Sequence, residues 1–355
     1  MKFKTACLAA SMAAAGLATA GMAHAQSSVT LYGLVDVNVE VHNNSADGQG
    51  GNKTVAGMRS GGQSGSRWGL RGSEDLGNGL KAIFQLESGF NVNDGYGDGR
   101  LFQRTAMGGL AGNWGELTFG RQYTSSFNLT GQFVPFRWGS LYEPINRFVP
   151  VRVDNAIKYR GKFAGADLSG YYGFSDTTSQ VVNDDDVTGT YGAALSYKFG
   201  AFSIVGGYDH ANEMRTVGVV TTGKMNNYLV GARVDIGQFN VTGVYRRRNQ
   251  DMPLGNDQRS NLYSLGLGYQ VSGAAGLELA YYREHFKEGQ LAGMTDDTWQ
   301  QVALRGTYAL SKRTNLYAVV AHSIDGPLAL SQSSFALAAG KDNQTGGAIG
   351  IRHLF

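Results

Sequence analysis

The side chains best suited to chemistry in this 355-residue sequence are arginines. Arg67 and Arg71 lie four positions apart in a strand-like segment, so alternation puts both guanidinium groups on the face opposite Trp68 and Leu70. A second group lies in or just before the stretch from 125 to 153, and it comprises Arg121, Arg137 and Arg147, with Glu143 as the accompanying acid. We expect this positive charge to be only partly neutralised, and pairing with strand carboxylates such as Glu87 is the alternative.

Motifs for catalysis, cofactors or metals find little support in the sequence. The five histidines after residue 25 form no His-x-x-x-His pair and no cluster with carboxylates. Gly-x-Ser-x-Gly, a P-loop and a complete Gly-x-Gly-x-x-Gly do not occur. The acidic run from Asp184 to Asp186 could bind a divalent cation, but a solvated loop tip is the simpler interpretation. We therefore expect no enzyme activity, no cofactor and no metal.

The N-terminus resembles a secretory signal peptide. Lys2 and Lys4 precede a run rich in alanine and glycine, which ends in Ala-His-Ala at positions 23 to 25. We expect cleavage after Ala25, which gives a leader at 1–25 and one mature domain at 26–355. Cleavage also removes Cys7, the single cysteine, and leaves a nearly neutral chain, so cysteine chemistry and nucleic-acid binding are not expected.

The rest of the chain has the composition of strands and turns. It is rich in glycine, tyrosine and phenylalanine, whereas the whole sequence holds only 5 prolines. About sixteen segments have strand character, a number within the even-numbered range of bacterial barrels. We expect strands at 28–42, 64–76, 80–93, 98–111, 115–124, 154–162, 167–175, 188–199, 201–211, 223–236, 238–249, 259–271, 277–287, 297–310, 315–323 and 344–355.

The connections and strand faces favour a barrel over a soluble sandwich. Short connections such as 77–79 and 311–314 alternate with long ones, as they do between the two rims of a membrane barrel. The strand at 263–271 has an apolar and aromatic face opposite a small and polar face, which fits lipid on one side and water on the other. The sequence thus predicts an all-β fold, a transmembrane antiparallel β-barrel with short periplasmic turns and long external loops.

The last strand ends without a polar tail. Ile349, Ile351, His353 and Phe355 share one of its faces. A terminal aromatic strand of this kind looks like the signal that the outer-membrane barrel-assembly machinery reads. We therefore expect Phe355 to be part of an assembly signal.

Several motifs together resemble the general porins of β-proteobacteria, of the Burkholderia and Neisseria type. They are SVTLYGLVDVNV, SRWGLRGSEDLGNGLKAIFQLESGF, GNWGELTFGRQY, RVDNAIKYR and the terminal GIRHLF, and the similarity spans the mature chain. The resemblance implies a sixteen-stranded barrel assembled as a homotrimer, with the third external loop folded into the lumen as a constriction. The loop from 125 to 153 fits, because it is long and rich in aromatic residues; packing on a neighbouring subunit is the alternative.

The resemblance also assigns a pore wall. Arg67, Arg104 and Arg152 match the arginines that such porins place opposite the loop, and a ring of uncompensated arginine attracts anions. The loop lacks the acidic Pro-Glu-Phe-Gly segment of some relatives, which leaves its individual contacts open.

The expected function is passive diffusion of small hydrophilic solutes and ions through the outer membrane, with a preference for anions. A substrate-specific channel for an anionic nutrient is the main alternative. A barrel enzyme and a surface adhesin are further hypotheses, and the sequence offers no catalytic cluster for the first. Outer-membrane lipid and lipopolysaccharide are the expected surroundings.

Overall fold

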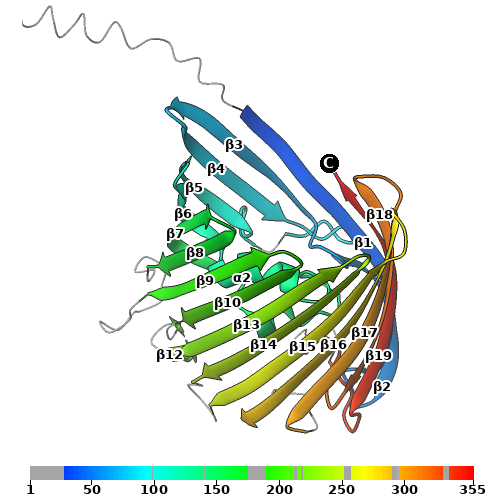
Figure 1. Cartoon of the computed structure of the whole chain (residues 1–355). Helices are drawn as coiled ribbons and strands as arrows, with labels where there is room; N and C mark the ends of the chain where they lie inside the picture. The colour runs from blue at the N-terminus through cyan, green and yellow to red at the C-terminus, as the bar shows by residue number, and fades with distance from the viewer. Residues whose placement is uncertain are drawn as a thin grey trace, which may run out of the picture.

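The computed structural model describes residues 28–97, 99–139, 141–174, 189–211, 214–216, 219–251, 257–289, 294, 296–330 and 336–355. Within these ranges a large antiparallel sheet curves around and closes on itself, because the first strand pairs with the last (Figure 1). The register of this closing pair runs from Leu34 opposite Leu354 to His42 opposite Gly346. Closure satisfies the backbone of both edge strands, which a sheet in a membrane requires.

The strands of the barrel are β1 (Ser28–Ala46), β2 (Asn52–Ser60), β3 (Arg67–Gly77), β4 (Leu80–Gly89), β5 (Thr105–Gly112), β6 (Gly115–Tyr123), β7 (Arg152–Phe163), β8 (Ala166–Gly173), β9 (Thr190–Phe199), β10 (Phe202–Ala211), β13 (Met225–Ile236), β14 (Phe239–Gln250), β15 (Gln258–Gln270), β16 (Ala275–Glu288), β17 (Thr298–Ala309), β18 (Thr314–Ile324) and β19 (Asn343–Leu354). The short strands β11 (Met214–Thr216) and β12 (Val219–Thr222) form a separate hairpin.

The predicted count of sixteen strands is confirmed, since β2 and β3 together form one strand position. Both pair with β1, β2 along Val37–Ala46 and β3 along Ser28–Leu34. The connector at 61–66 interrupts them, and its backbone N–H groups at Gly62, Gln63 and Ser64 donate to the buried carboxylate of Asp36 at 3.0, 2.8 and 2.7 Å. The buried carboxylate of Asp36 thereby holds the connector at 61–66 in place.

Two differences from the predicted strands are larger than a shift of a few residues at a strand end. The segment from 52 to 60 is a strand that was not expected, and the expected strand at 98–111 begins only at Thr105. Gln103 and Arg104 belong to the connection before that strand. This connection brings Arg104 to Glu87, the residue at which the β4–β5 ladder begins.

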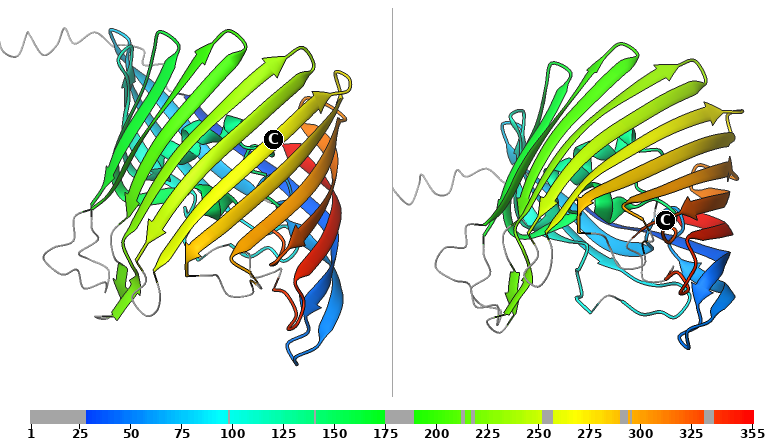
Figure 2. Two further views of the ribbon diagram at one scale, coloured as in Figure 1. Left: turned by 60° about the horizontal axis from the view of Figure 1, so that its bottom comes forward. Right: turned by 90° about the horizontal axis from the view of Figure 1, so that it is seen from below.

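The connections alternate in length as predicted. At one rim the turns are short, and the turn between β3 and β4 uses left-handed backbone at Gly77, Asn78 and Gly79, with φ of 87°, 53° and 78°. Left-handed backbone of this kind favours glycine and asparagine. The connection between β1 and β2 lies at the opposite rim, as the left view of Figure 2 shows.

Side chains along the strands alternate between an apolar outer face and a polar inner face. On β15, Tyr263, Leu265 and Leu267 are 45%, 60% and 44% exposed, whereas Ser264 between them is buried. This outward apolar surface suits contact with lipid. Among the described residues no helix has the length and apolar character needed to cross a membrane.

The segment between β6 and β7 lies against the inner wall of the barrel. It contains α2 (Ser125–Thr130), the 3-10 turn η1 (Gly131–Phe133) and α3 (Ile145–Phe148). Its α2 packs on β8, β9 and β10, and both ribbon views place its helices within the barrel outline (Figures 1 and 2). Phe133, Phe136, Tyr142 and Phe148 are buried in the cluster that this segment forms with inward side chains of the wall. We call residues 125–151 the inner loop.

Candidate pore constriction

A cavity of about 500 Å³ lies between the inner loop and the barrel wall. The wall contributes Arg67, Arg104, Tyr123 and Arg152, and the connector between β2 and β3 contributes Ser64 and Gly65. The inner loop supplies the facing side, which consists of Phe127, Asn128, Arg137, Trp138, Pro144, Ile145, Asn146 and Val151, and Ala329 completes the lining. The three arginines named for the pore wall therefore meet in one cavity opposite the loop.

Two of the three wall arginines lie close to one carboxylate. Nε of Arg104 donates to Oε1 of Glu87 at 2.7 Å, and Nη1 of Arg67 lies 3.9 Å from the same oxygen. Nε of Arg67 donates instead to the backbone oxygen of Gly65 at 2.9 Å. Arg152 makes no contact with Glu87; its Nε donates to the backbone oxygen of Arg104 at 2.8 Å. The alternative, pairing with Glu87, therefore holds for Arg104, whereas Arg67 lies 3.9 Å from that carboxylate.

Tyr123 at the end of β6 contacts two of the wall arginines, Arg104 and Arg152. Its hydroxyl accepts from Nη2 of Arg104 at 2.8 Å and from Nη2 of Arg152 at 3.0 Å. The guanidinium carbon of Arg152 lies 4.6 Å from the centre of the tyrosine ring, in cation–π contact. The opposite face of the ring stacks on Phe127, with centroids 4.6 Å apart, and Phe127 stacks on Trp138 at 5.1 Å. This aromatic stack ties the wall to the inner loop.

Arg137 supplies positive charge from the loop side of the cavity. It and Trp138 both have left-handed backbone, with φ of 53° and 64°, which is uncommon for residues with large side chains. The indole nitrogen of Trp138 donates to the backbone oxygen of Phe127 at 2.9 Å and so fixes this turn. Arg137 itself is exposed, and its side chain lines the cavity.

Arg121 and Arg71 lie outside this cavity. Arg121 forms an ion pair with Asp154, which Arg100 also contacts at 2.9 Å. Arg71 lies nearer the short-turn rim, where its guanidinium is 5.1 Å from the ring centre of Tyr32 and lines a separate hollow of about 260 Å³. Alternation places Arg71 on the same strand face as Arg67. It does not give the height of either side chain along the barrel axis.

Glu143 and Arg147 are buried anchors of the inner loop rather than lining residues of the cavity. Oε1 of Glu143 accepts from the backbone N–H of Phe136 and from the hydroxyl of Tyr282, both at 3.0 Å. Burial raises the pKa of Glu143 to about 7. Neither Glu143 nor Arg147 is among the residues that line the cavity.

Arg147 is held by a carboxylate on the opposite wall. Its Nε and Nη2 donate to the two oxygens of Glu284 on β16 at 2.9 and 2.6 Å, and Arg246 on β14 approaches the same carboxylate at 2.5 Å. Sequence reasoning missed Glu284 and Tyr282 because both are single polar residues on the inner face of an ordinary strand. The alternation of Arg246 and Arg248 against Arg247 was the available signal, and the first two indeed face inward.

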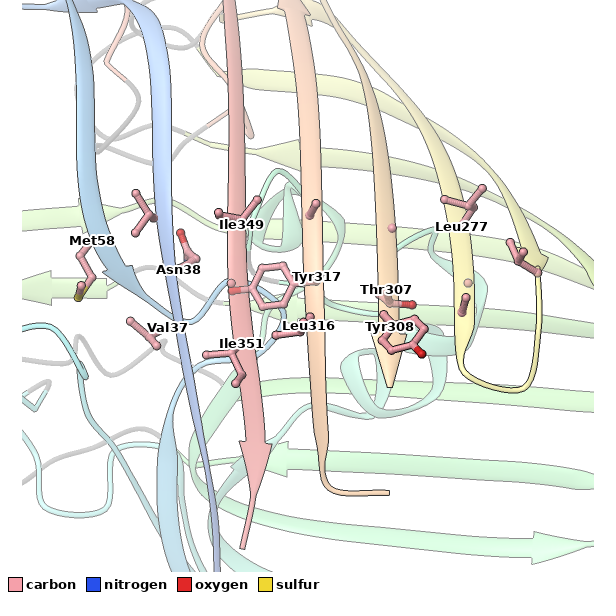
Figure 3. Close-up of a pocket in the computed structure, with 17 residues that line it drawn as sticks. Val37, Asn38, Met58, Leu277, Thr307, Tyr308, Leu316, Tyr317, Ile349 and Ile351 are labelled. Carbon is pink, nitrogen blue, oxygen red and sulfur yellow. The ribbon is translucent and has the colours of Figure 1, made fainter. Parts of the chain in front are cut away.

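A larger hollow of about 870 Å³ lies on the outer surface and takes no part in the pore. Figure 3 shows its labelled side chains on neighbouring strands, among them Val37, Leu316, Ile349 and Ile351. It is a shallow apolar depression where small residues such as Gly306 and Ala318 lie between larger ones.

The terminal Phe355 extends the seam between the first and last strands. Its backbone N–H donates to Gly33 at 3.0 Å, and its backbone oxygen accepts from Gly33 at 3.1 Å. The ring crosses over Gly33, where an added Cβ would lie 2.4 Å from Cζ of Phe355 and 2.6 Å from the backbone oxygen of Arg67.

Two expectations fall outside this description. The leader at 1–25 and the run from Asp184 to Asp186 lie outside the described residues. Within the described ranges no group of three or more histidine, cysteine or acidic side chains is arranged to hold a metal ion.

Comparisons with known proteins agree with this architecture. A family model described as Gram-negative porin matches residues 9–325. The chain is 33% identical to outer membrane porin protein 32 of Delftia acidovorans, over 97% of this chain and 99% of that protein. It is 31% identical to an outer membrane porin protein of Bordetella pertussis, over 95% and 96%.

A solved structure supports the same conclusion. The anion-selective porin from Comamonas acidovorans has a TM-score of 0.78 and 28% identity, over 93% of this chain and 100% of that one. With a closed sixteen-strand barrel, outward apolar faces and family similarity along nearly its whole length, the chain belongs to the Gram-negative porin family and is a channel of the outer membrane.

Proposed function

We propose that this porin is a general diffusion channel that prefers anions, and that Arg67, Arg104, Arg152 and Arg137 set this preference. The observation that carries the proposal is the charge balance at the constriction. Four arginines line the cavity, and Glu87 pairs with Arg104 at 2.7 Å and lies 3.9 Å from Arg67. Since Arg104 engages Glu87 directly, most of the positive charge is left to act on permeating ions.

The size of the effect follows from Coulomb's law. One net charge about 4 Å from an ion contributes about 1 kcal/mol even with the dielectric constant of water. That energy corresponds to a factor of about five in the local concentration of an anion relative to a neutral solute. The anion selectivity named for the Comamonas acidovorans porin, a relative of similar structure, supports the same sign. Reversal potentials in a salt gradient test the proposal.

We further propose that the functional unit is a homotrimer, as the family resemblance implies. A trimer form is named for OmpT of Vibrio cholerae, whose structure is similar in fold at 17% identity. The outward apolar surface, with its depression over β1, β2 and β16–β19, is compatible with burial against a neighbouring subunit. Chemical cross-linking of the folded protein in detergent tests the oligomeric state.

Three proposals concern biogenesis and surroundings. Residues 1–25 are removed on export, and Phe355 is read by the barrel-assembly machinery. Arg247 and Arg283 point outward near the long-loop rim, where phosphate groups of lipopolysaccharide would lie. Mass measurement of the mature chain and the yield of folded protein after deletion of Phe355 test the first two.

A further inference from the structure

The constriction cavity has two chemically different surfaces. The barrel wall carries the guanidinium groups of Arg67, Arg104 and Arg152, and the inner loop adds that of Arg137. The inner loop also contributes apolar surface, which comes from Phe127, Trp138, Pro144, Ile145 and Val151. A channel that only attracted inorganic anions would gain nothing from the apolar surface, so the combination points to a more specific ligand.

The cationic surface offers donors for a carboxylate. A guanidinium carries five N–H groups in a planar fork that matches the two oxygens of a carboxylate. The contacts described for Arg152 engage its Nε and Nη2, so its Nη1 remains available to a ligand. Arg137, which the inner loop contributes, lines the same cavity. A carboxylate placed between them would replace its hydration with charge-assisted hydrogen bonds.

The apolar surface offers a place for a hydrocarbon chain. Phe127 stacks between Tyr123 and Trp138, and all three rings line the cavity. Ile145 at the start of α3 is half-buried and extends this surface. A chain lying here would remove apolar area from water on both partners, which stabilises the complex in proportion to the area buried.

We propose that the cavity is a binding site for small amphiphilic carboxylates. The carboxylate binds Arg152 and Arg137, and the hydrocarbon chain lies along Phe127 and Ile145. This inference rests on the anion-preferring channel proposed above and adds the class of solute that binds at its constriction.

Current block in planar bilayers tests the proposal. The folded protein conducts chloride while sodium acetate or sodium hexanoate is added to one side at pH 7, where both carboxylates are ionised. We expect hexanoate to halve the chloride current at a concentration about tenfold lower than acetate, because its extra methylene groups are partly buried. Equal block by the two ions would overturn the proposal, even in a channel that prefers anions.

Two matched variants locate the site. Ile145→Ser should raise the half-blocking concentration of hexanoate about threefold to fivefold and leave that of acetate unchanged. Ile83→Ser is the control, because Ile83 lines the separate hollow beside Arg71 and not the constriction. Equal effects of the two variants would overturn the assignment of the site. Discrimination between the carboxylates in a channel without anion preference would contradict the proposed function alone.

Discussion

Arg147 of the inner loop and Glu284 of β16 form a two-point salt bridge, although 137 residues separate them in the chain. Arg147 is 5% exposed and Glu284 is fully buried, so the pair joins the loop to the far wall away from bulk water. Arg246 contacts the same carboxylate from β14. One acidic side chain thus compensates two buried cations.

This arrangement predicts an order of effects for two substitutions. Glu284→Ala leaves two buried arginines without their partner and should destabilise the attachment of the inner loop by about 3 kcal/mol or more. Arg147→Ala leaves Glu284 paired with Arg246 and should cost less. Hydrogen exchange of residues 141–149, measured by mass spectrometry, checks the order. A larger effect of Arg147→Ala would contradict this description of the cluster.

Glu143 predicts a pH dependence of the inner loop. Its pKa is raised to about 7 because the carboxyl is buried, so the folded loop favours the protonated form. The stabilisation is fully present below the ordinary pKa near 4.5 and is lost as the pH rises through 7, a change of about 3 kcal/mol. We expect opening of the loop, seen as excess current noise, to be rarer at pH 5 than at pH 8.

Glu143→Gln provides the control for this prediction. The amide keeps an acceptor for the N–H of Phe136 and the hydroxyl of Tyr282, but it does not titrate over this range. Current noise in the variant should be nearly independent of pH between 5 and 8. An unchanged pH dependence would assign the effect to another group.

Closure of the barrel predicts a strict requirement at Gly33. A Cβ there would meet the backbone oxygen of Arg67 at 2.6 Å, and backbone in a ladder cannot easily move. Gly33→Ala should therefore lower stability by about 1 to 3 kcal/mol. Gly57→Ala on β2 is the matched control, since an added Cβ meets nothing within 4 Å there. The midpoint of heat-induced unfolding, read from the electrophoretic shift of the folded band, should fall only for Gly33→Ala.

Much of the fold could be predicted from the sequence because strands alternate with a period of two residues. That period gives the apolar face and the direction of Arg246 and Arg248, and segments rich in glycine and asparagine mark the short turns. It could not give the interruption at 61–66, because the contacts of Asp36 with that connector depend on three-dimensional proximity.

The candidate site was predicted less completely than the fold. Arg67, Arg104 and Arg152 line one cavity, as the family motifs imply. Arg71 instead lines a separate hollow, and Arg121 pairs with Asp154 outside the cavity. The anchors of the inner loop join segments more than one hundred residues apart, as Arg147 and Glu284 illustrate. Local patterns carry no information on such pairs.

The reversal potential in a potassium chloride gradient tests the central claim most directly. The native channel should give a potential of the sign for chloride preference, and the triple variant Arg67→Gln, Arg104→Gln, Arg152→Gln should shift it towards zero or beyond. Arg71→Gln, outside the constriction, should leave it nearly unchanged. A native channel that prefers potassium, or a triple variant with unchanged selectivity, would contradict the assignment of these arginines as the anion-selecting wall.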